Sequence, residues 1–545
     1  MSNFTAFTNS ETWTAIASPK SAILLLINLP LIAVVLNVLS QLLISKNPND
    51  PPLVFHWLPY VGSAVQYGTD PINFFVRCQK KYGNVFTFVL FGRRVTVALG
   101  PKGNNLILGG KLSEVSAEEA YTHLTTPVFG AGVVYDCPNN MLMEQKKFVK
   151  VGLSIENFRQ YVGMIVNEVE DFLDTDPAFF QYQTGDINEW GKFPAYKKLA
   201  ELIILTASRT LQGHEVRESL HKGFADRYHD LDGGFTPLNF LFPNLPLASY
   251  RKRDVSHKAM SDFYISIIEK RRQENRIEEG DMLSALSQQT YKDGRPLTDR
   301  EMAHIMIALL MAGQHTSSTS TTWCLLHVVA NPEIADALYK EQVEHFGQDD
   351  GSLASLTYEE LKTLPLLDAV IRETLRTHPP IHSIMRKVIS DIVVPPTLSA
   401  PRDENRTYII PKGHFVLASP AVSHMDAAYW KDPEEFDPYR WFDQSGAAAA
   451  ALDSYDNGGD KIDYGFGQVS KGTESPYQPF GAGRHRCIGE QFAYLQIGTV
   501  ISTLIRRLEM RIEKGVPEHN YQTLITQPQG ECGVLYRRRP DPKKN

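Results

Sequence analysis

The sequence predicts a mainly α-helical protein with a smaller β-rich portion, preceded by one apolar helix near the N-terminus. Three observations carry this prediction. An uncharged apolar run covers residues 22–44, a long helical pattern covers about residues 298–330, and short β-patterned runs occur within residues 85–99 and 407–418. With 43% hydrophobic and 21% charged residues and a mean hydropathy of −0.24, the chain has the composition of a globular protein. A polytopic membrane protein, a coiled coil and a disordered chain are therefore excluded.

Residues 1–21 form a short polar tail, and the 23 positions of residues 22–44 carry no charge. As a helix they would span ~34 Å, enough to cross the apolar core of a bilayer, so a transmembrane anchor is predicted. A cleaved signal peptide is disfavoured because the preceding flank is not basic and the run is too long. A buried core helix stays open, because polar residues interrupt the run at Asn28, Asn37, Ser40 and Gln41.

The proline-rich residues 45–52 predict a stiff hinge, and residues 53–545 a single globular body, although 545 residues would suggest three or four domains. Thr298 and Glu301 form a capping-box pattern that begins the long helix, and Asn331-Pro332 ends it. A second helix ends near Thr377, before two prolines. Residues 443–477 are rich in Gly, Ser and Asp and predict a surface insertion loop. The strands are predicted at Val85–Leu90, Arg94–Leu99, Thr407–Ile410 and His414–Ala418.

The charge and the cysteines exclude several classes of function. The formal net charge is −7, from 55 basic and 62 acidic residues, so the chain lacks the electrostatic footprint of a nucleic-acid-binding protein. The five cysteines are widely spaced and include no C-x-x-C pair, which argues against a disulfide framework and a cysteine-rich zinc site. A reducing compartment with one special cysteine is the more natural interpretation.

The most informative segment runs from Phe480 to Glu490 and reads FGAGRHRCIGE. Its cysteine, Cys487, lies among three glycines that let a flat, bulky group approach the backbone, and a helical pattern follows. The basic residues 484–486 and the helix N-terminus lower the cost of an anionic sulfur. Two other interpretations remain: a glycine-rich turn with a small core cysteine, and a catalytic thiol that lacks an assigned base.

This segment resembles the haem-binding loop of the cytochrome P-450 superfamily of haem-thiolate monooxygenases. The resemblance implies a haem-thiolate cytochrome fold with haem b as cofactor. It makes Cys487 the axial ligand of the iron, whose thiolate favours O–O cleavage, and places Phe480 beside the haem. The sequence departs from the family at His485, where an arginine is usual, so a propionate contact there would be weaker and sensitive to pH.

Other motifs occur in the family's order. Glu373 and Arg376, at i and i+3 of a helix, resemble its E-x-x-R pair, and Arg440 in FDPYRW resembles the third member of that triad. The segment AGQHT, residues 312–316, resembles the oxygen-activation site, in which Thr316 would help to deliver protons. His315 stands where most members of the family have an acid before this threonine, so the usual acid–alcohol proton relay is in doubt. A histidine at this position resembles the sterol 14α-demethylase subfamily.

The subfamily resemblance extends from about Pro51 to Cys532 and implies further roles. The residues implied to contact the haem propionates are Tyr121, Tyr135, Lys146, Arg386 and His485. Those implied to line the sterol pocket are Phe129, Phe235, Phe240, Ile381 and Ser383. For any one of these aromatic residues, ordinary core packing is the alternative.

The sequence has neither a P-loop nor a complete dinucleotide fingerprint, so the chain is predicted to bind no NADPH or flavin itself. The resemblance implies sterol 14α-demethylation, with O2 and NADPH as cosubstrates and electrons from an NADPH–cytochrome reductase. It also implies a single-pass protein of the endoplasmic reticulum membrane with a cytosolic catalytic domain that contacts the lipid bilayer. Another membrane-bound haem-thiolate lipid hydroxylase and a non-enzymatic haem sensor or carrier remain as alternatives.

Overall fold

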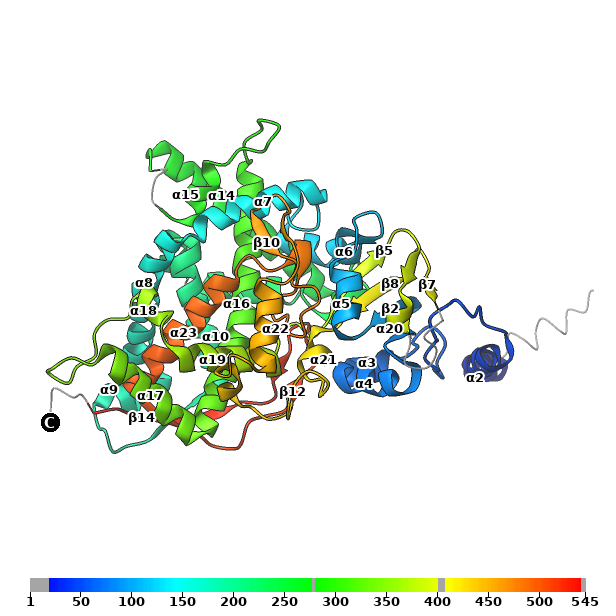
Figure 1. The fold of residues 1–545 in the computed structure, drawn as a ribbon. Helices are drawn as coiled ribbons and strands as arrows, with labels where there is room; N and C mark the ends of the chain where they lie inside the picture. Colours follow the sequence, from blue (N-terminus) through cyan, green and yellow to red (C-terminus); the bar gives the residue numbers. More distant parts are fainter. Residues whose placement is uncertain (1–18, 221, 277–279, 400–406, 541–545) are drawn as a thin grey trace, which may run out of the picture.

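The computed structural model describes residues 19–220, 222–276, 280–399 and 407–540. Helices fill one side of the molecule, the largest sheet lies on the other, and helix α2 lies beyond the sheet (Figure 1). Because helices carry most of the core and the sheets are small, the predicted mainly α architecture with a smaller β-rich portion is confirmed.

The largest sheet has five strands in the order β1-β2-β8-β5-β3, and only the β2–β8 pair is parallel. Strands β1 and β2 form a hairpin in which Thr87 lies opposite Thr96, and their hydroxyls are 2.8 Å apart. Phe91 and Gly92 make the turn with positive φ angles of 46° and 74°. The strands are β1 (Val85–Leu90), β2 (Arg93–Ala98), β3 (Val115–Ser116), β5 (Ile384–Val388) and β8 (Phe415–Ala418).

The helical side is built around α16 (Asp299–Ala330), which is buried along most of its length. Among the described helices, those that pack most extensively against it are α10 (Ala195–Ala207), α14 (Ala248–Gln273), α19 (Pro365–Thr377) and α23 (Glu490–Arg507). The other α-helices are α3 (Ala64–Thr69), α4 (Pro71–Tyr82), α5 (Gly100–Leu108), α6 (Glu118–Phe129), α7 (Asn139–Gly152), α8 (Ile155–Thr175), α9 (Phe180–Thr184), α11 (His214–Glu218), α12 (Lys222–Asp232), α13 (Pro237–Leu241), α15 (Met282–Ser287), α17 (Pro332–Phe346), α18 (Tyr358–Leu361), α20 (Pro396–Ser399), α21 (Pro420–His424) and α22 (Ala447–Asp456).

Smaller sheets complete the fold. The C-terminal segment pairs with an earlier strand in a three-stranded sheet of order β11-β14-β4, and three two-stranded ribbons lie elsewhere. Their strands are β4 (Gly191–Pro194), β6 (Ile392–Val394), β7 (Tyr408–Ile410), β9 (Lys461–Asp463), β10 (Gln468–Ser470), β11 (Leu508–Ile512), β12 (His519–Asn520), β13 (Gln527–Pro528) and β14 (Gly533–Arg538).

The start of α16 confirms the predicted capping box. The Thr298 hydroxyl accepts from the Glu301 backbone N–H, and the Glu301 carboxylate accepts from the Thr298 backbone N–H. The helix ends where predicted, because Asn331 caps the next helix, α17, and Pro332 is its first residue. The helix predicted to end at Thr377 is α19, and all four predicted strands are present with boundaries within one residue.

The prediction of a surface insertion loop over residues 443–477 is wrong in its secondary structure. The alanine tract opens helix α22, and strands β9 and β10 form a hairpin behind it. Ala448, Ala451 and Tyr455 are buried with Trp430 and Tyr477 in a hydrophobic cluster. The composition suggested a loop because Gly, Ser and Asp dominate, but consecutive alanines are the best helix formers and bury a small face closely.

Helix α2 (Pro19–Leu43) lies where the apolar anchor was predicted and contains Pro30. In the part of the chain that the structure describes, we find no helix with the length and apolarity that a membrane crossing needs. The polar residues of this run have partners. The Gln41 amide both donates to the His56 carbonyl (2.8 Å) and accepts from the His56 N–H (3.2 Å), and Asn37 donates to the carbonyls of His56 and Trp57.

The proline-rich connection after α2 lies against the body. Pro51 is buried, and the Asn49 carbonyl accepts from the Ile409 N–H. Thr87 of β1 then exchanges backbone hydrogen bonds with Pro52 and Val54. Helix α2 is thus joined to the body through side-chain contacts and through a strand-like connection.

Glu373 is at the centre of a buried polar network that joins α19 to residues 435–441. Its carboxylate accepts from Arg376, Arg440, the Trp441 indole and the Asp437 N–H at 2.8–3.1 Å. Glu373 and Arg376 are both fully buried. The triad expected from the E-x-x-R motif is therefore assembled, with Trp441 as a member that the motif did not reveal.

We expect Glu373→Gln to lower the free energy of unfolding by about 3–5 kcal/mol, because it leaves the buried Arg376 and the half-buried Arg440 without their carboxylate. Equilibrium denaturation of the purified protein measures this change. The matched control is Glu359→Gln, which breaks an exposed pair with Arg159 and should change stability little. Equal effects of the two substitutions would contradict the structural role of the network.

Candidate functional site

The segment around Cys487 folds into a closed loop ahead of helix α23. The Cys487 N–H donates to the Phe480 carbonyl at 3.0 Å, which closes the loop at its neck. Gly483, in the loop, has a φ of 65°, and a β-carbon there would lie 2.6 Å from the Leu108 carbonyl oxygen. Only glycine fits this turn. The Phe480 ring packs against Tyr494 of α23, with ring centroids 5.7 Å apart.

The Cys487 thiol combines accessibility with a buried environment. Cys487 has accessible surface, yet the protein around its sulfur excludes enough water to raise the thiol pKa. This combination is expected of a side chain that lines an enclosed space. The Gly489 N–H donates to the sulfur and, with the charges of Lys146 and Arg486, opposes this rise in the thiol pKa without overcoming it. This hydrogen bond and these charges would stabilise the sulfur as a thiolate once a metal cation replaces its proton.

Cations gather beside this thiol without carboxylate partners. Arg386 of β5 is 4% exposed, and its hydrogen bond in the structure is to the neighbouring Met385 carbonyl. Lys146 of α7 donates to the carbonyls of Arg484 and Arg486, on either side of His485. Among the described residues, no carboxylate lies within ion-pair distance of Arg386 or Lys146.

The pKa values reflect this excess of positive charge. Burial, with smaller contributions from Arg386 and Lys150, lowers the pKa of Lys146 to about 7, although the negative charge of a Cys487 thiolate opposes the change. Burial, Arg386 and Lys146 together hold the His485 pKa well below its usual value. A buried, uncompensated group of cations is costly, so the site favours an anionic ligand.

Two tyrosines continue this surface away from the loop. Tyr121 of α6 stacks on Tyr135 with centroids 5.3 Å apart, and Tyr135 lies 6.0 Å from the His485 ring. The Tyr121 hydroxyl accepts from the Met385 N–H, next to Arg386. Burial raises the pKa of Tyr135 to about 12, so this hydroxyl stays a donor at neutral pH. All five residues predicted to contact propionates are thus brought together from α6, α7, β5 and the loops.

Helix α16 presents an accessible patch in its otherwise buried middle. Ala312 is exposed, and a β-carbon added to Gly313 would meet only the Leu211 side chain, at 4.0 Å. The Thr316 hydroxyl donates to the Ala312 carbonyl at 2.8 Å. His315 turns to helix α12, where its Nε2 lies 2.6 Å from an Asp232 carboxylate oxygen. An acid therefore lies beside His315, although it comes from another helix.

The residues predicted to line a pocket fall into three groups. Phe129 stacks on Phe235 at 5.5 Å, near the end of α6. Phe240 lies 6.4 Å from Tyr121, toward the other end of that helix. Ile381 is 47% exposed, and the Ser383 hydroxyl forms hydrogen bonds with His382 and Ser419. Their contact with a substrate stays a prediction.

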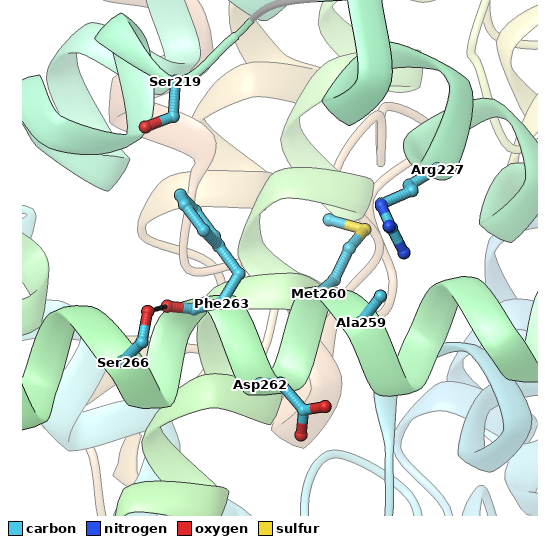
Figure 2. A pocket seen from close by; sticks show the side chains of 7 residues that line it. All are labelled: Ser219, Arg227, Ala259, Met260, Asp262, Phe263 and Ser266. Carbon is cyan, nitrogen blue, oxygen red and sulfur yellow. Dashed lines mark hydrogen bonds between the residues drawn. The ribbon is translucent and has the colours of Figure 1, made fainter.

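Two hollows on the molecular surface lie away from these residues. Figure 2 shows one of about 500 Å³ between Ser219, Arg227 of α12 and the 259–266 face of α14. A second, of about 430 Å³, lies between α19 and α22 and reaches Trp441 and Asp456. Neither is lined by Cys487, Thr316 or the cationic group.

Comparison with known proteins decides the family. A family model described as cytochrome P-450 matches residues 51–534. The chain belongs to the cytochrome P-450 family. It is therefore a haem-thiolate monooxygenase that uses haem b, with electrons from NADPH supplied through a reductase.

Relatives of this cytochrome P-450 cover nearly all of it. It is 54% identical to a lanosterol 14-alpha demethylase of Mycosarcoma maydis, over 94% of this chain and 92% of that one. It is 48% identical to an eburicol 14-alpha-demethylase of Uncinula necator, over 91% and 92%. A solved cyanobacterial cytochrome with bound retinoic acid matches with a TM-score of 0.70 and 21% identity, covering 91% of this chain and all of that one. This last likeness confirms the fold alone.

The residues of this P-450 fit a haem. The accessible thiol of Cys487 supplies a sulfur ligand, and the group formed by Arg386, Lys146, Tyr121 and Tyr135 lacks only the carboxylates that haem propionates provide. When bound, the haem supplies oxygen chemistry at its iron, which the chain's own side chains lack.

Sequence reasoning missed three residues of the site. Asp232 and Tyr228, which lie beside His315, are distant in sequence, and no motif contains them. Tyr455 lies in the segment predicted to be a loop. The first two carried no sequence signal, whereas the alanine tract before Tyr455 could have indicated a helix.

We expect Arg386→Met to have opposite effects on the two forms of the protein. The haem-free form should gain about 1 kcal/mol or more of stability, because a buried unpaired charge is removed. The haem-bound form should lose haem to apomyoglobin about 10- to 100-fold faster, because a charge-assisted contact is lost.

The matched control is Lys387→Met on the same strand, whose ammonium donates to the exposed Gly413 carbonyl. It should leave the rate of haem loss near that of the wild type. Destabilisation of the haem-free Arg386→Met protein would contradict the assignment of an anion-binding role.

Proposed function

We propose that this cytochrome P-450 is a sterol 14α-demethylase that removes the 14α-methyl group of lanosterol or eburicol as formate. Each of three successive oxidations would use O2 and two electrons. The observation that carries the proposal is the extent of similarity: relatives named as lanosterol and eburicol demethylases align over more than nine-tenths of this chain at 48–54% identity.

Two sets of residues would hold the haem: a ligand to its iron and a group of donors to its propionates. Cys487 would provide the axial sulfur, and the closed loop fixes the direction of that sulfur through the Phe480–Cys487 hydrogen bond. Arg386, Lys146, Tyr121, Tyr135 and His485 would hold the two propionates. The propionates would supply the negative charge that Arg386 and Lys146 lack and would accept from buried donors, which makes loading of haem favourable.

Protons would be delivered from the α16 side. Thr316 would present its hydroxyl where oxygen is reduced, and its bond to the Ala312 carbonyl keeps it oriented. His315 and Asp232 form a pair that can take a proton from the α12 side and return to its resting state. The acid that the family usually places before the threonine would here act from helix α12 through His315.

The substrate would lie against the aromatic residues along α6. Flat apolar side chains such as the Phe129–Phe235 pair suit a rigid hydrocarbon ring system, which offers contact area and few polar atoms. Ile381 would contribute from the opposite segment. Because the methyl group is unreactive, the site of oxidation would be set by this positioning.

The protein would work at the endoplasmic reticulum membrane, with residues 22–44 as its anchor, residues 45–52 as the connection and residues 53–545 as the cytosolic catalytic domain. Support comes from the uncharged apolar run and from exposed leucines on α2, among them Leu36, Leu42 and Leu43. The partner would be an NADPH–cytochrome reductase, because the chain has no dinucleotide fingerprint of its own.

The test is product analysis with lanosterol and eburicol, using the purified protein, a P-450 reductase and NADPH in lipid vesicles. We expect the 14-demethylated sterol and formate in equal amounts. The control is Cys487→Ala, which should lose both product and the red-shifted carbon-monoxide band of thiolate-ligated haem. Oxidation of another lipid without demethylation would favour a different lipid hydroxylase, and haem binding without turnover a sensor or carrier.

Thr316→Ala should reduce sterol turnover about 10- to 100-fold while haem content and the carbon-monoxide band survive, because one proton donor is lost and the sulfur ligand is not. More of the NADPH consumed should appear as hydrogen peroxide. Turnover is measured with peroxide and formate in the same reaction. The neighbouring control is Thr319→Ala, which lies deeper in α16. Unchanged turnover by Thr316→Ala would contradict its assigned role.

A further inference from the structure

Tyr455, at the end of α22, contacts the cysteine loop on both sides of its neck. Its hydroxyl donates to the Gly481 carbonyl at 2.9 Å, and its own carbonyl accepts from Arg486 at 3.0 Å. The Arg486 guanidinium also lies over the Tyr455 ring, 3.7 Å from its centroid. Gly481 follows Phe480 and Arg486 precedes Cys487, so these contacts flank the hydrogen bond that closes the loop.

Arg486 is held in this position by two carboxylates. It donates to Glu490 from Nε and Nη2, at 2.9 and 3.1 Å, and to Asp456 at 3.0 Å. Tyr455 is 1% exposed and packs with Tyr477 and Trp430, so its ring is fixed by the cluster that covers α22. The cysteine loop is thus held by the Tyr455 side chain and by Glu490 of α23, the helix that follows the loop.

We propose that Tyr455 is a positioning residue for Cys487, and that Tyr455 and Arg486 form a clamp that keeps the sulfur on the haem iron. The inference rests on the proposed role of Cys487 as the axial ligand. With the neck held at Gly481 and Arg486, the Cys487 N–H keeps its bond to Phe480, and the sulfur keeps its direction. Loosening the neck should let the sulfur leave the iron while the rest of the fold persists.

The test compares Tyr455→Phe with Tyr477→Phe in the full-length holoenzyme. Tyr477 is buried in the same cluster, and its hydroxyl contacts the Arg372 carbonyl and Tyr494, not the cysteine loop. In mild guanidinium, the ferrous carbon-monoxide complex is followed as the red-shifted band of thiolate-ligated haem gives way to the band of haem without thiolate. Tryptophan fluorescence follows global unfolding in the same samples.

We expect Tyr455→Phe to lose the thiolate band about five-fold faster than the wild type, the effect of one ordinary hydrogen bond, ahead of global unfolding. In Tyr477→Phe, the thiolate band should disappear only as the protein unfolds. Equal acceleration by both variants, or loss of the thiolate band only with unfolding in Tyr455→Phe, overturns the proposal.

A second pair of variants tests the arginine side of the clamp. Asp456→Asn weakens the hold on Arg486 and should accelerate thiolate loss in the same direction, but less, because Asp456 is partly exposed. Asp453→Asn, one turn earlier on α22, contacts Asn457 and should behave as the wild type. Equal behaviour of these two variants overturns the role of Arg486.

The outcome is separable from that of the proposed sterol reaction. A wild-type protein without the red-shifted band refutes Cys487 as ligand, and the clamp with it. If the enzyme does not demethylate sterols but Tyr455→Phe still loses the thiolate band faster, the clamp is supported and the sterol function is refuted.

Discussion

The site depends on one electrostatic constraint: positive charge is buried where no carboxylate of the described chain can compensate it. Arg386 and Lys146 come from a strand and a helix that are far apart in sequence. Lys146 donates to the cysteine loop, and Arg386 lies close enough to lower the pKa of His485 in that loop. Water cannot solvate them fully, as the lowered Lys146 pKa indicates. An anionic cofactor therefore completes the fold as much as it serves the chemistry, because its carboxylates replace the missing counter-charges.

Other contacts in the fold hold the cysteine loop in position beside these cations. The Glu373 network ties α19 to the segment that leads to α22, and α22 in turn contacts the cysteine loop through Tyr455. Helix α16 closes the opposite side with an accessible patch at Ala312. Structural and functional residues are consequently hard to separate: a change at α22 would alter the cysteine loop although it touches no substrate.

Much of this arrangement could be predicted from the sequence, and the reason differs between elements. The bounds of α16 follow from local chemistry, since a capping box and a proline mark its ends within a few residues. The cysteine loop could be recognised because its glycines and basic residues are contiguous. Asp232 could not, because its role depends on how α12 packs against α16, which no local pattern records. The segment of residues 443–477 was misjudged because its composition is that of a loop, while burial of Ala448, Ala451 and Tyr455 stabilises a helix there.

The contacts of Asn37 and Gln41 bear on how a soluble form of the protein should be designed. A truncation at the proline-rich segment would remove four hydrogen bonds to the backbone of His56 and Trp57. A shorter truncation that begins just before Asn37 would discard most of the apolar helix and keep its last two turns as a built-in cap on the catalytic body.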